Sequence, residues 1–354
     1  MSKEAQWVIG PQWDRVAFSD ASYGFSEGMA CVMKDGKWGF IDKTGEVVIP
    51  IRWEEARSFR DGLALVAVDG KYGFLGKDGE FVVEPKWEGA KDFSAGVAPV
   101  KESRKWGFID KSGALVIPNQ FDSAKGFSDG LAQVRVGKEI QFIDTMGVPV
   151  ISGAWQEAKD FSEGLAAVKA DDKWGFIDKT GKLAIPPTYE FATRFVDGLS
   201  PVGNEGKKGY IDPNGKLQVQ LQYDTALPFR EERGCVRSDK KWGFIDTSGK
   251  VVVPLEWDCN FYPVFNEGVA VLERGREVAF VDASGTVIKG PFDPKAIFYA
   301  PQRKWVNADG KVIEAEAIGL SESEVTFLVD GKSVLYPRAK LSAEDQKWLE
   351  ANEK

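Results

Sequence analysis

The chain has 354 residues, of which 43% are hydrophobic and 28% are charged, so it can bury a sizeable core and is long enough for two domains. Its formal net charge of −8 argues against nucleic-acid binding, which depends on basic side chains that neutralise phosphates. The sequence contains no histidine, which excludes Ser-His-Asp and Cys-His catalysis and any zinc site that needs a histidine ligand.

The N-terminal segment and the cysteines give no sign of export, membrane insertion or metal binding. Residues 1–14 lack the apolar core of a signal peptide, and no run approaches roughly 18 uncharged apolar residues. We therefore expect a cytoplasmic protein as written, or a secreted one if a signal peptide has been removed, with no membrane contact. Cys31, Cys235 and Cys259 are too irregularly spaced for a disulfide framework or a metal site, and are predicted to be small buried residues.

One nine-residue segment recurs at 37–45, 105–113, 173–181 and 241–249, and its first copy reads KWGFIDKTG. A phenylalanine before each Ser-Glu-Gly-like triplet reveals the underlying period, with six steps of 34 residues and a last step of 36. These phenylalanines are Phe25, Phe59, Phe93, Phe127, Phe161, Phe195, Phe229 and Phe265. The chain therefore contains eight repeat units, and the last follows an insertion within 259–264.

Each unit reads as a series of short β-strands. In the second unit, residues 62–68 alternate in polarity, 71–76 are aromatic, 80–85 are β-branched, and a weaker element follows at 87–90. No unit contains a helical pattern of about ten residues, which excludes helical repeats of similar length. The residue five places after each phenylalanine is always small, so neighbouring sheets are expected to crowd there. This favours an all-β, propeller-like array of eight 34-residue units, with an open β-solenoid as the alternative.

An Asp-x-x-Gly segment lies between two apolar runs in seven units, and in the second unit Gly76 replaces the aspartate. The pattern predicts a hairpin turn, in which the aspartate binds its own backbone and the glycine takes the positive-φ position. We interpret these aspartates as structural, with a calcium or substrate role as the alternative. The glycines are Gly45, Gly79, Gly113, Gly147, Gly181, Gly215, Gly249 and Gly285.

The tryptophan of the nine-residue segment is present only in the odd-numbered units. It stands at Trp38, Trp106, Trp174 and Trp242, and this alternation accounts for the 68-residue spacing. On a strand, Trp38 and Phe40 share one face, whereas Gly39 lies on the other. We predict that the indole packs between repeats and that the glycine allows another backbone or ring to approach. An aromatic stripe that binds sugar or peptide is the alternative.

The in-register KWGFIDKTG…VVIP pattern resembles the WG-repeat family over about residues 7–294. The resemblance implies an all-β repeat fold of propeller type, but it implies no common ligand or activity. Ile140, Lys208 and Val278 stand in place of the tryptophan, which argues against a uniform tryptophan-based ligand site. WVIGPQWD at 7–14 is similar to the end of the last unit, so the chain begins in the closing part of a unit.

Residues 303–350 leave the period and resemble the SHD-type domain of an endocytic Sla adaptor. The matching residues are Arg303, Trp305, Asp309, Gly310, Ala315, Val325, Asp330, Gly331, Pro337, Leu341, Ser342, Asp345 and Leu349. We expect strands at 311–320 and 324–329, a hairpin at 330–331, and a final helix capped by Ser342 and Asp345. A small SH3-like barrel with a C-terminal helix fits this order, so the predicted domains are 1–298 and 299–354. The resemblance implies capture of short Asn-Pro-Phe peptides, with a purely structural barrel as the alternative.

The sequence favours a non-enzymatic interaction scaffold with no cofactor, no metal and no catalytic residue. We expect a monomer that binds a protein or peptide and does not bind nucleic acid or membrane. Tyr336, Arg338 and Lys340 lie near Pro337 and are the candidate partner-binding residues. The alternative is a carbohydrate-binding or carbohydrate-hydrolysing protein that uses exposed tryptophans and carboxylates on loops.

Overall fold

The computed structural model describes residues 13–19, 22–266, 268–275, 277–292, 300–307, 309, 311–320, 324–329 and 332–352. Contacts divide the chain into two compact units, one made of Trp13–Glu256 with Val264–Asn266, the other of Met1–Gln12, Trp257–Pro263 and Glu267–Lys354. The predicted domain boundary at residue 298 lies outside the described residues, as does most of the segment 7–14. In the part of the chain that is described, the only α-helix is α1 (Ala343–Asn352), which confirms the all-β expectation for the repeats.

Eight consecutive antiparallel sheets match the eight predicted units. Sheet 1 contains β1 (Arg15–Val16), β4 (Phe25–Ser26), β5 (Met29–Lys34), β6 (Lys37–Ile41) and β7 (Val47–Trp53), and the hairpin of β2 (Phe18–Ser19) and β3 (Ser22–Tyr23) lies between β1 and β4 in sequence. Sheet 2 contains β8 (Glu55–Ala56), β9 (Ala64–Val68), β10 (Lys71–Leu75) and β11 (Phe81–Trp87). Sheet 3 contains β12 (Gly89–Ala90), β13 (Val97–Glu102), β14 (Lys105–Asp110) and β15 (Leu115–Phe121). Sheet 4 contains β16 (Ser123–Ser128), β17 (Leu131–Val136), β18 (Glu139–Ile143) and β19 (Pro149–Gly153).

The remaining four sheets of the repeat region follow the same order. Sheet 5 contains β20 (Glu157–Ala158), β21 (Leu165–Ala170), β22 (Lys173–Asp178) and β23 (Leu183–Tyr189). Sheet 6 contains β24 (Phe191–Ala192), β25 (Ser200–Asn204), β26 (Lys207–Ile211) and β27 (Leu217–Tyr223). Sheet 7 contains β28 (Thr225–Ala226), β29 (Gly234–Ser238), β30 (Lys241–Ile245) and β31 (Val251–Trp257). Sheet 8 contains β32 (Phe265–Asn266), β33 (Val269–Arg274), β34 (Glu277–Asp282) and β35 (Val287–Phe292).

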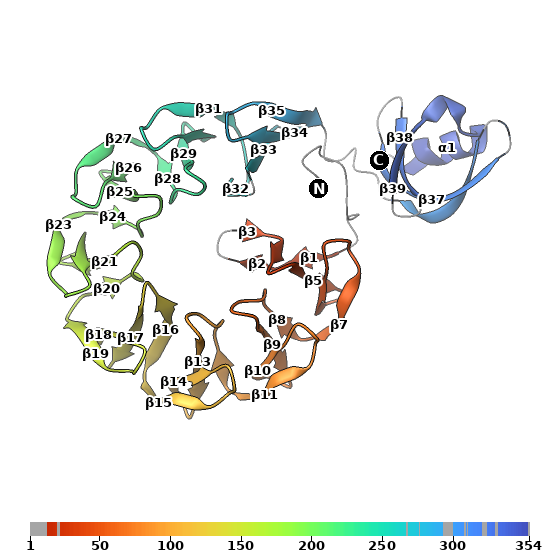
Figure 1. Cartoon of the computed structure of the whole chain (residues 1–354). Helices are drawn as coiled ribbons and strands as arrows, with labels where there is room; N and C mark the ends of the chain where they lie inside the picture. The colour runs from red at the N-terminus through yellow and green to blue at the C-terminus, as the bar shows by residue number, and fades with distance from the viewer. Residues whose placement is uncertain are drawn as a thin grey trace. The chain divides into compact units, whose positions relative to one another are not determined.

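Within the Trp13–Glu256 unit, the sheets follow one another along an arc, with the first strand of each sheet on the inside and the last strand on the outside (Figure 1). The weaker element predicted at 87–90 is the first strand of the next sheet, because β12 pairs with β13. Each step of the arc therefore begins with an inner strand and ends with an outer edge strand.

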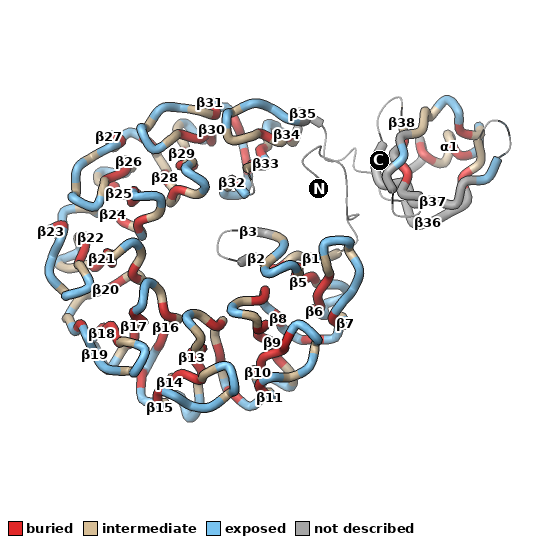
Figure 2. The backbone as a smooth tube through the Cα atoms, viewed as in Figure 1, coloured by how far each residue is buried: buried red, intermediate tan, exposed pale blue. Residues whose placement is uncertain are grey.

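Aromatic pairs hold successive sheets together. Phe142 of sheet 4 and Phe161 of sheet 5 are fully buried, and their ring centroids lie 4.8 Å apart in an edge-to-face arrangement. The small residues predicted to allow this approach are buried as expected, since Ala166 packs in the same cluster as these two rings. Figure 2 shows that buried residues gather on the strands inside each sheet and that exposed residues dominate the outer strands. The other pairs are Phe40–Phe59, Phe74–Phe93, Phe108–Phe127, Phe176–Phe195, Tyr210–Phe229 and Phe244–Phe265.

The glycine after the tryptophan allows the outer strand to bulge. In sheet 3, Trp106 pairs with Phe121 and Phe108 pairs with Ile117. An advance of two residues along β14 therefore lies opposite an advance of four residues along β15. In sheet 4, Gln141 occupies the glycine position, and β18 pairs with β19 without that bulge. The predicted close approach is therefore made by the backbone of the neighbouring strand in the same sheet.

The C-terminal sheet is an antiparallel meander of β36 (Ala300–Val306), β37 (Val312–Leu320), β38 (Glu324–Val329) and β39 (Lys332–Pro337). A 3-10 turn, η2 (Arg338–Lys340), leads to α1, and the core includes Trp305, Phe327 and Leu349. The Ser342 hydroxyl accepts the Asp345 N–H at 3.2 Å, which confirms the predicted cap. The hairpin predicted at 330–331 lies outside the described residues. The four strands pair in the order in which they occur in the sequence, and the SH3-like barrel stays a prediction.

Candidate functional site

The Asp-x-x-Gly segments form the predicted hairpin turns. All eight glycines have φ between 80° and 92°. In sheet 3, Asp110 Oδ1 accepts the N–H groups of Ser112 and Ala114 and the Ser112 hydroxyl, at 2.9, 3.1 and 2.6 Å. The Ser112 hydroxyl is the largest cause that lowers the pKa of this carboxyl. One oxygen of each of these carboxylates binds the backbone of its own turn, which supports the structural interpretation.

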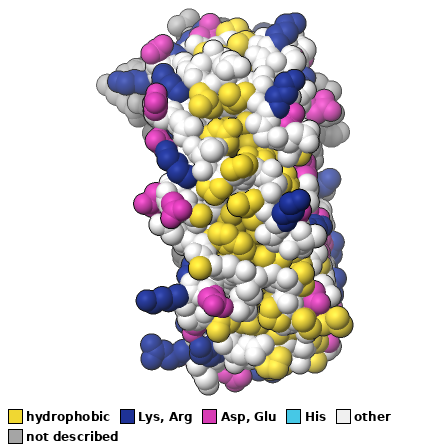
Figure 3. Space-filling view, turned by 90° about the vertical axis from the view of Figure 1, so that its left-hand side faces the viewer, with side chains coloured by type: hydrophobic (Ala, Val, Ile, Leu, Met, Phe, Trp, Pro, Cys, Tyr) yellow, Lys and Arg dark blue, Asp and Glu magenta, His cyan; other side chains and the backbone are white. Residues whose placement is uncertain are grey.

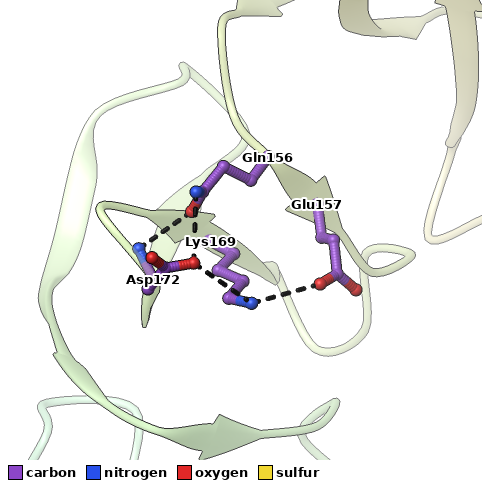
Figure 4. Close-up of polar contacts among 4 residues, drawn as sticks. All are labelled: Gln156, Glu157, Lys169 and Asp172. Atoms are coloured by element: carbon purple, nitrogen blue, oxygen red, sulfur yellow. Dashed lines mark hydrogen bonds and ion pairs between the residues drawn. The ribbon is translucent and has the colours of Figure 1, made fainter.

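A second set of side chains caps the turn between the second and third strands of each sheet. Each precedes the inner strand of its sheet and accepts a backbone N–H from that turn, as Asp122 does from Gly137 at 2.7 Å. Sheet 5 uses an amide instead, because Gln156 accepts the Asp172 N–H at 2.9 Å and donates to its carboxylate at 3.2 Å. Figure 4 shows this cluster, in which Lys169 also pairs with Glu157 at 3.4 Å and with Asp172 at 3.7 Å. The other members of the set are Asp14, Glu54, Glu88, Glu190, Asp224 and Asp258.

A third set of carboxylates joins one sheet to the next. Asp129 has φ of 53° and accepts the N–H of Gly164, which lies 35 residues ahead, at 2.6 Å. Glu27, Asp61, Glu163 and Asp197 make the same link to residues 62, 96, 198 and 232. Ala95 occupies this position in sheet 3 and has the same left-handed backbone, with φ of 52°. Most of the recurring acidic residues are therefore structural.

The four tryptophans of the WG segments pack against the protein. Trp174 and Trp242 are buried, with 7% and 2% of their surface exposed, and Trp38 and Trp106 are half-buried. Trp106 packs against the cluster that fills the space between sheets 3 and 4, as predicted for an inter-repeat residue. None of the four presents an exposed platform.

Basic residues recur on the backbone segments at the inner side of the arc, a row that sequence reasoning did not single out. We call the segments 57–60, 91–94, 125–128, 159–162, 193–196 and 227–230 the inner wall, because they follow or extend the inner strands (Figure 1). The second residue of the repeat Ala-x-x-Phe motif in this wall is Arg57, Lys91, Lys125 and Lys159 in sheets 2 to 5. Lys91 and Lys159 lie over the rings of Trp106 and Trp174, at 5.2 and 5.0 Å from the centroids. A unit-by-unit comparison of 56–59, 90–93, 124–127 and 158–161 would have revealed this row.

Two of these cations pair with an aspartate of the next sheet. Arg57 lies 3.8 Å from Asp92, and Lys125 lies 3.1 Å from Asp160. Each pair crosses a junction between neighbouring sheets. Lys91 has no ion-pair partner among the described residues, and its ammonium donates to the carbonyl of Ala124 at 2.7 Å. Among the described residues, the inner wall therefore combines two paired cations, Arg57 and Lys125, with two that have no ion-pair partner, Lys91 and Lys159.

The C-terminal candidate residues lie on one short segment. Tyr336 is half-buried at the end of β39, and its ring lies 6.0 Å from that of Phe327, so much of it belongs to the core. Its hydroxyl lies 3.5 Å from the Lys340 carbonyl, a long hydrogen bond that ties β39 to η2. Arg338 is half-buried and Lys340 is exposed, both in η2. Lys340 is thus the most accessible of the three.

An apolar band follows the outer strands. The first residues of these strands are exposed apolar side chains, such as Val47, Val48, Val82, Leu115, Val116, Val150, Leu183 and Val251. Figure 3 shows apolar side chains gathered down the middle of the face that the outer strands form, with charged residues along its sides. Seven of the eight outer strands contain a proline, and only β27 has none. These prolines oppose pairing with another chain, because proline lacks the N–H that an added strand needs.

Other site types find no support in the described part of the chain. No group of three or more Cys, Asp or Glu residues there could hold a metal ion. The three cysteines are buried as predicted, and burial raises the pKa of Cys259 to about 11. Within the same residues, no helix is long and apolar enough to cross a membrane.

Comparison with known proteins agrees with the repeat count. A family model described as "WG containing repeat" matches residues 1–38, 38–72, 72–106, 106–139, 142–174, 174–207, 209–242 and 242–273. No curated protein sequence matches the chain.

Among solved structures, the chain is similar to one described as "Crystal structure of the eukaryotic initiation factor", with TM-score 0.53 and 13% identity over 88% of this chain and 96% of that chain. It is also similar to apo AztD from Citrobacter koseri, with TM-score 0.43 and 12% identity over 75% and 94% of the two chains. Hsv2p from Kluyveromyces lactis gives TM-score 0.42 and 8% identity over 66% and 93%. At these identities, the first likeness concerns the fold alone.

Proposed function

Because the chain belongs to the family of WG-containing repeat proteins, which is defined by a repeated β-sheet unit, we propose that it is a non-enzymatic scaffold that binds protein or peptide partners. The recurring aspartates support this proposal, since Asp110, Asp122 and Asp129 each bind backbone N–H groups of the fold. The sequence also lacks histidine, the commonest general acid and base. Its recurring polar residues thus stabilise the fold more than they provide catalytic groups.

The observation that carries the proposal is the row of cations on the inner wall. Arg57, Lys91, Lys125 and Lys159 stand at one position of four successive units, in a chain whose net charge is −8. A polypeptide that follows the arc would meet the same type of side chain at each sheet. Regular spacing of this kind suits an extended ligand better than a single small molecule.

Chemical cross-linking tests the scaffold proposal on the full chain. The protein is mixed with an extract of its source cells, treated with an amine-reactive reagent and digested, and the cross-linked peptides are identified by mass spectrometry. We expect cross-links from Lys91, Lys125 or Lys159 to a polypeptide partner, with fewer from the turn residues Lys43 and Lys111. Hydrolysis or binding of a glycan panel without any polypeptide partner would contradict the proposal. The carbohydrate alternative has no exposed platform among the four WG tryptophans.

We further propose that residues 303–350 form an SHD-type domain that captures short peptides beside η2. Lys340 is the exposed cation there, and Lys347 on α1 is an exposed cation outside this segment. In the full chain, Lys340→Ala is expected to weaken binding of a labelled Asn-Pro-Phe peptide, whereas Lys347→Ala leaves it unchanged. Fluorescence anisotropy measures both. Equal binding by all three proteins would reject this segment as the binding site.

A further inference from the structure

The inner wall repeats one ion pair at alternate junctions. The cation at the second position of the Ala-x-x-Phe motif in one sheet forms an ion pair with the aspartate at the third position of the motif in the next sheet. At the junction of sheets 2 and 3 these residues are Arg57 and Asp92, and at the junction of sheets 4 and 5 they are Lys125 and Asp160. The two pairs are 68 residues apart in sequence, so they share the two-unit period.

The junction of sheets 3 and 4, which lies between these pairs, has the cation without the carboxylate. Lys91 occupies the second position of sheet 3, but the third position of sheet 4 is Gly126. Burial is the largest cause that lowers the pKa of Lys91; the nearby Lys125 and Arg57 act in the same direction, and Asp160 opposes them. Asp160 forms its ion pair with Lys125, so Lys91 has no carboxylate within ion-pair distance among the described residues.

A hydroxyl at the same junction also lacks the contact that its counterparts make. Ser26, Ser128 and Ser162 each donate to a phenylalanine carbonyl of the next sheet at 2.7 Å. The corresponding Ser94 hydroxyl is buried and has no hydrogen-bond partner within the described residues. It lies directly beside Gly126, since a Cβ on that glycine would be 2.8 Å from Ser94 Oγ. The Ser94 hydroxyl thus lies at the position without a side chain, and the Lys91 ammonium binds the carbonyl of Ala124, two residues before it.

We propose that the junction of sheets 3 and 4 binds a carboxylate side chain of an extended acidic polypeptide, with Lys91 as its ion-pair partner. The carboxylate would take the role that Asp92 and Asp160 play at the neighbouring junctions. This inference rests on the proposed scaffold function and names the chemistry of its partner. It follows from charge complementarity, because the paired carboxylates of this wall show which group its cations accept.

A polypeptide fits this site better than a free anion. The cation row continues on both sides of Lys91, at Arg57 and Lys125, and each of these already has a carboxylate from the protein. A ligand therefore anchors at one junction and passes over neighbours whose charges are already paired.

The test measures binding of labelled hexaglutamate to the full chain by fluorescence anisotropy at low ionic strength, with hexaglutamine as the uncharged probe. We expect hexaglutamate to bind and hexaglutamine not to bind. Lys91→Gln is expected to weaken hexaglutamate binding at least tenfold. Gly126→Asp, made together with Ser94→Ala to leave room for the new Cβ, supplies the carboxylate from within the chain and should abolish binding without lowering the melting temperature.

Lys159→Gln is the matched control. Lys159 has the same position and the same stacking on a tryptophan, but it faces a junction whose third position is Arg194. We expect this variant to bind hexaglutamate as the wild type does. Equal weakening by Lys91→Gln and Lys159→Gln, undiminished binding by the folded Ser94→Ala, Gly126→Asp double variant, or no binding by the wild type would overturn the inference. Acetate that competes as well as hexaglutamate would also overturn it, since the ligand would then be a small anion.

The scaffold proposal fails separately. A cross-linked polypeptide partner whose binding does not change in Lys91→Gln would preserve the scaffold and reject this junction. Binding of hexaglutamate without any cellular polypeptide partner would preserve this junction as an anion site and reject the scaffold.

Discussion

A Cβ atom on Gly107 would lie 2.5 Å from the carbonyl oxygen of Ile117 and 2.8 Å from the N atom of Asn119 on the adjacent strand. Both contacts are with backbone, which cannot rotate away as a side chain does. The equivalent glycines, Gly73 and Gly175, face the outer strands of their own sheets equally closely. The glycine of the WG segment thus leaves room for the bulge in the outer strand.

Replacing Gly107 by alanine should therefore destabilise the protein by about 1–3 kcal/mol, the usual cost of forcing extra volume into a packed site. Gln141→Ala is the control, because sheet 4 has no bulge at this position and already tolerates a side chain. Urea denaturation of both variants measures the free energy of unfolding. A Gly107→Ala protein as stable as the wild type would show that β15 adjusts freely.

The sequence predicted most of the fold because the fold repeats. Eight glycines in register identified the turns, and the small residues at positions such as Ala166 identified where sheets meet. The bulge was not predicted, since it depends on pairing between Gly107 and a strand whose register no local pattern defines. The cation row was missed for another reason. Lys91 shows no unusual pattern within its own unit, and its significance appears only when the third position of the motif is compared between units, where Asp92, Gly126 and Asp160 stand.

The aromatic pairs between sheets should contribute strongly to stability. Phe161 is fully buried against Phe142, and truncating such a ring typically costs about 3–5 kcal/mol. Phe25 holds the same position in sheet 1 but is 42% exposed. We expect Phe161→Ala to lower the melting temperature sharply and Phe25→Ala to lower it far less. Similar losses in calorimetry would show that position in the repeat, and not burial, determines the effect.

Ala95 offers a stabilising substitution. Asp61 and Asp129 at the same position accept N–H groups 35 residues ahead, at 2.8 and 2.6 Å. Ala95→Asp should form the same link to Gly130 and raise the free energy of unfolding by about 0.5–1.5 kcal/mol. Ala95→Gly relieves the left-handed backbone without adding an acceptor, so it separates the two causes. A gain no larger in Ala95→Asp than in Ala95→Gly would assign the effect to the backbone alone.

The turn aspartates predict loss of stability in acid. Hydrogen bonds lower the pKa of Asp110 below its ordinary value of 3.8, and the Ser112 hydroxyl is the largest cause. Because the folded pKa is below the unfolded one, this contribution is complete above pH 3.8 and is lost as pH falls through the lower folded value. Asp42, Asp178 and Asp246 behave in the same way.

Chemical denaturation between neutral pH and strong acid should therefore show a steep fall in the free energy of unfolding below pH 3.8. Asp110→Asn and Ser112→Ala should each make that fall shallower, with the larger change in Asp110→Asn. If both variants follow the wild-type curve, the turns do not contribute to acid sensitivity.

The links between neighbouring sheets also bear on the order in which the protein is made. Hydrogen bonds between neighbouring sheets of the Trp13–Glu256 unit join residues close in sequence, such as Ser162 and Phe195, 33 positions apart, and Lys179 and Asp129, 50 positions apart. A chain emerging from the ribosome at about 5–20 residues per second completes each such contact within seconds, without waiting for a distant segment. Sheets can therefore dock one after another during translation, and the direction of synthesis becomes the direction of assembly.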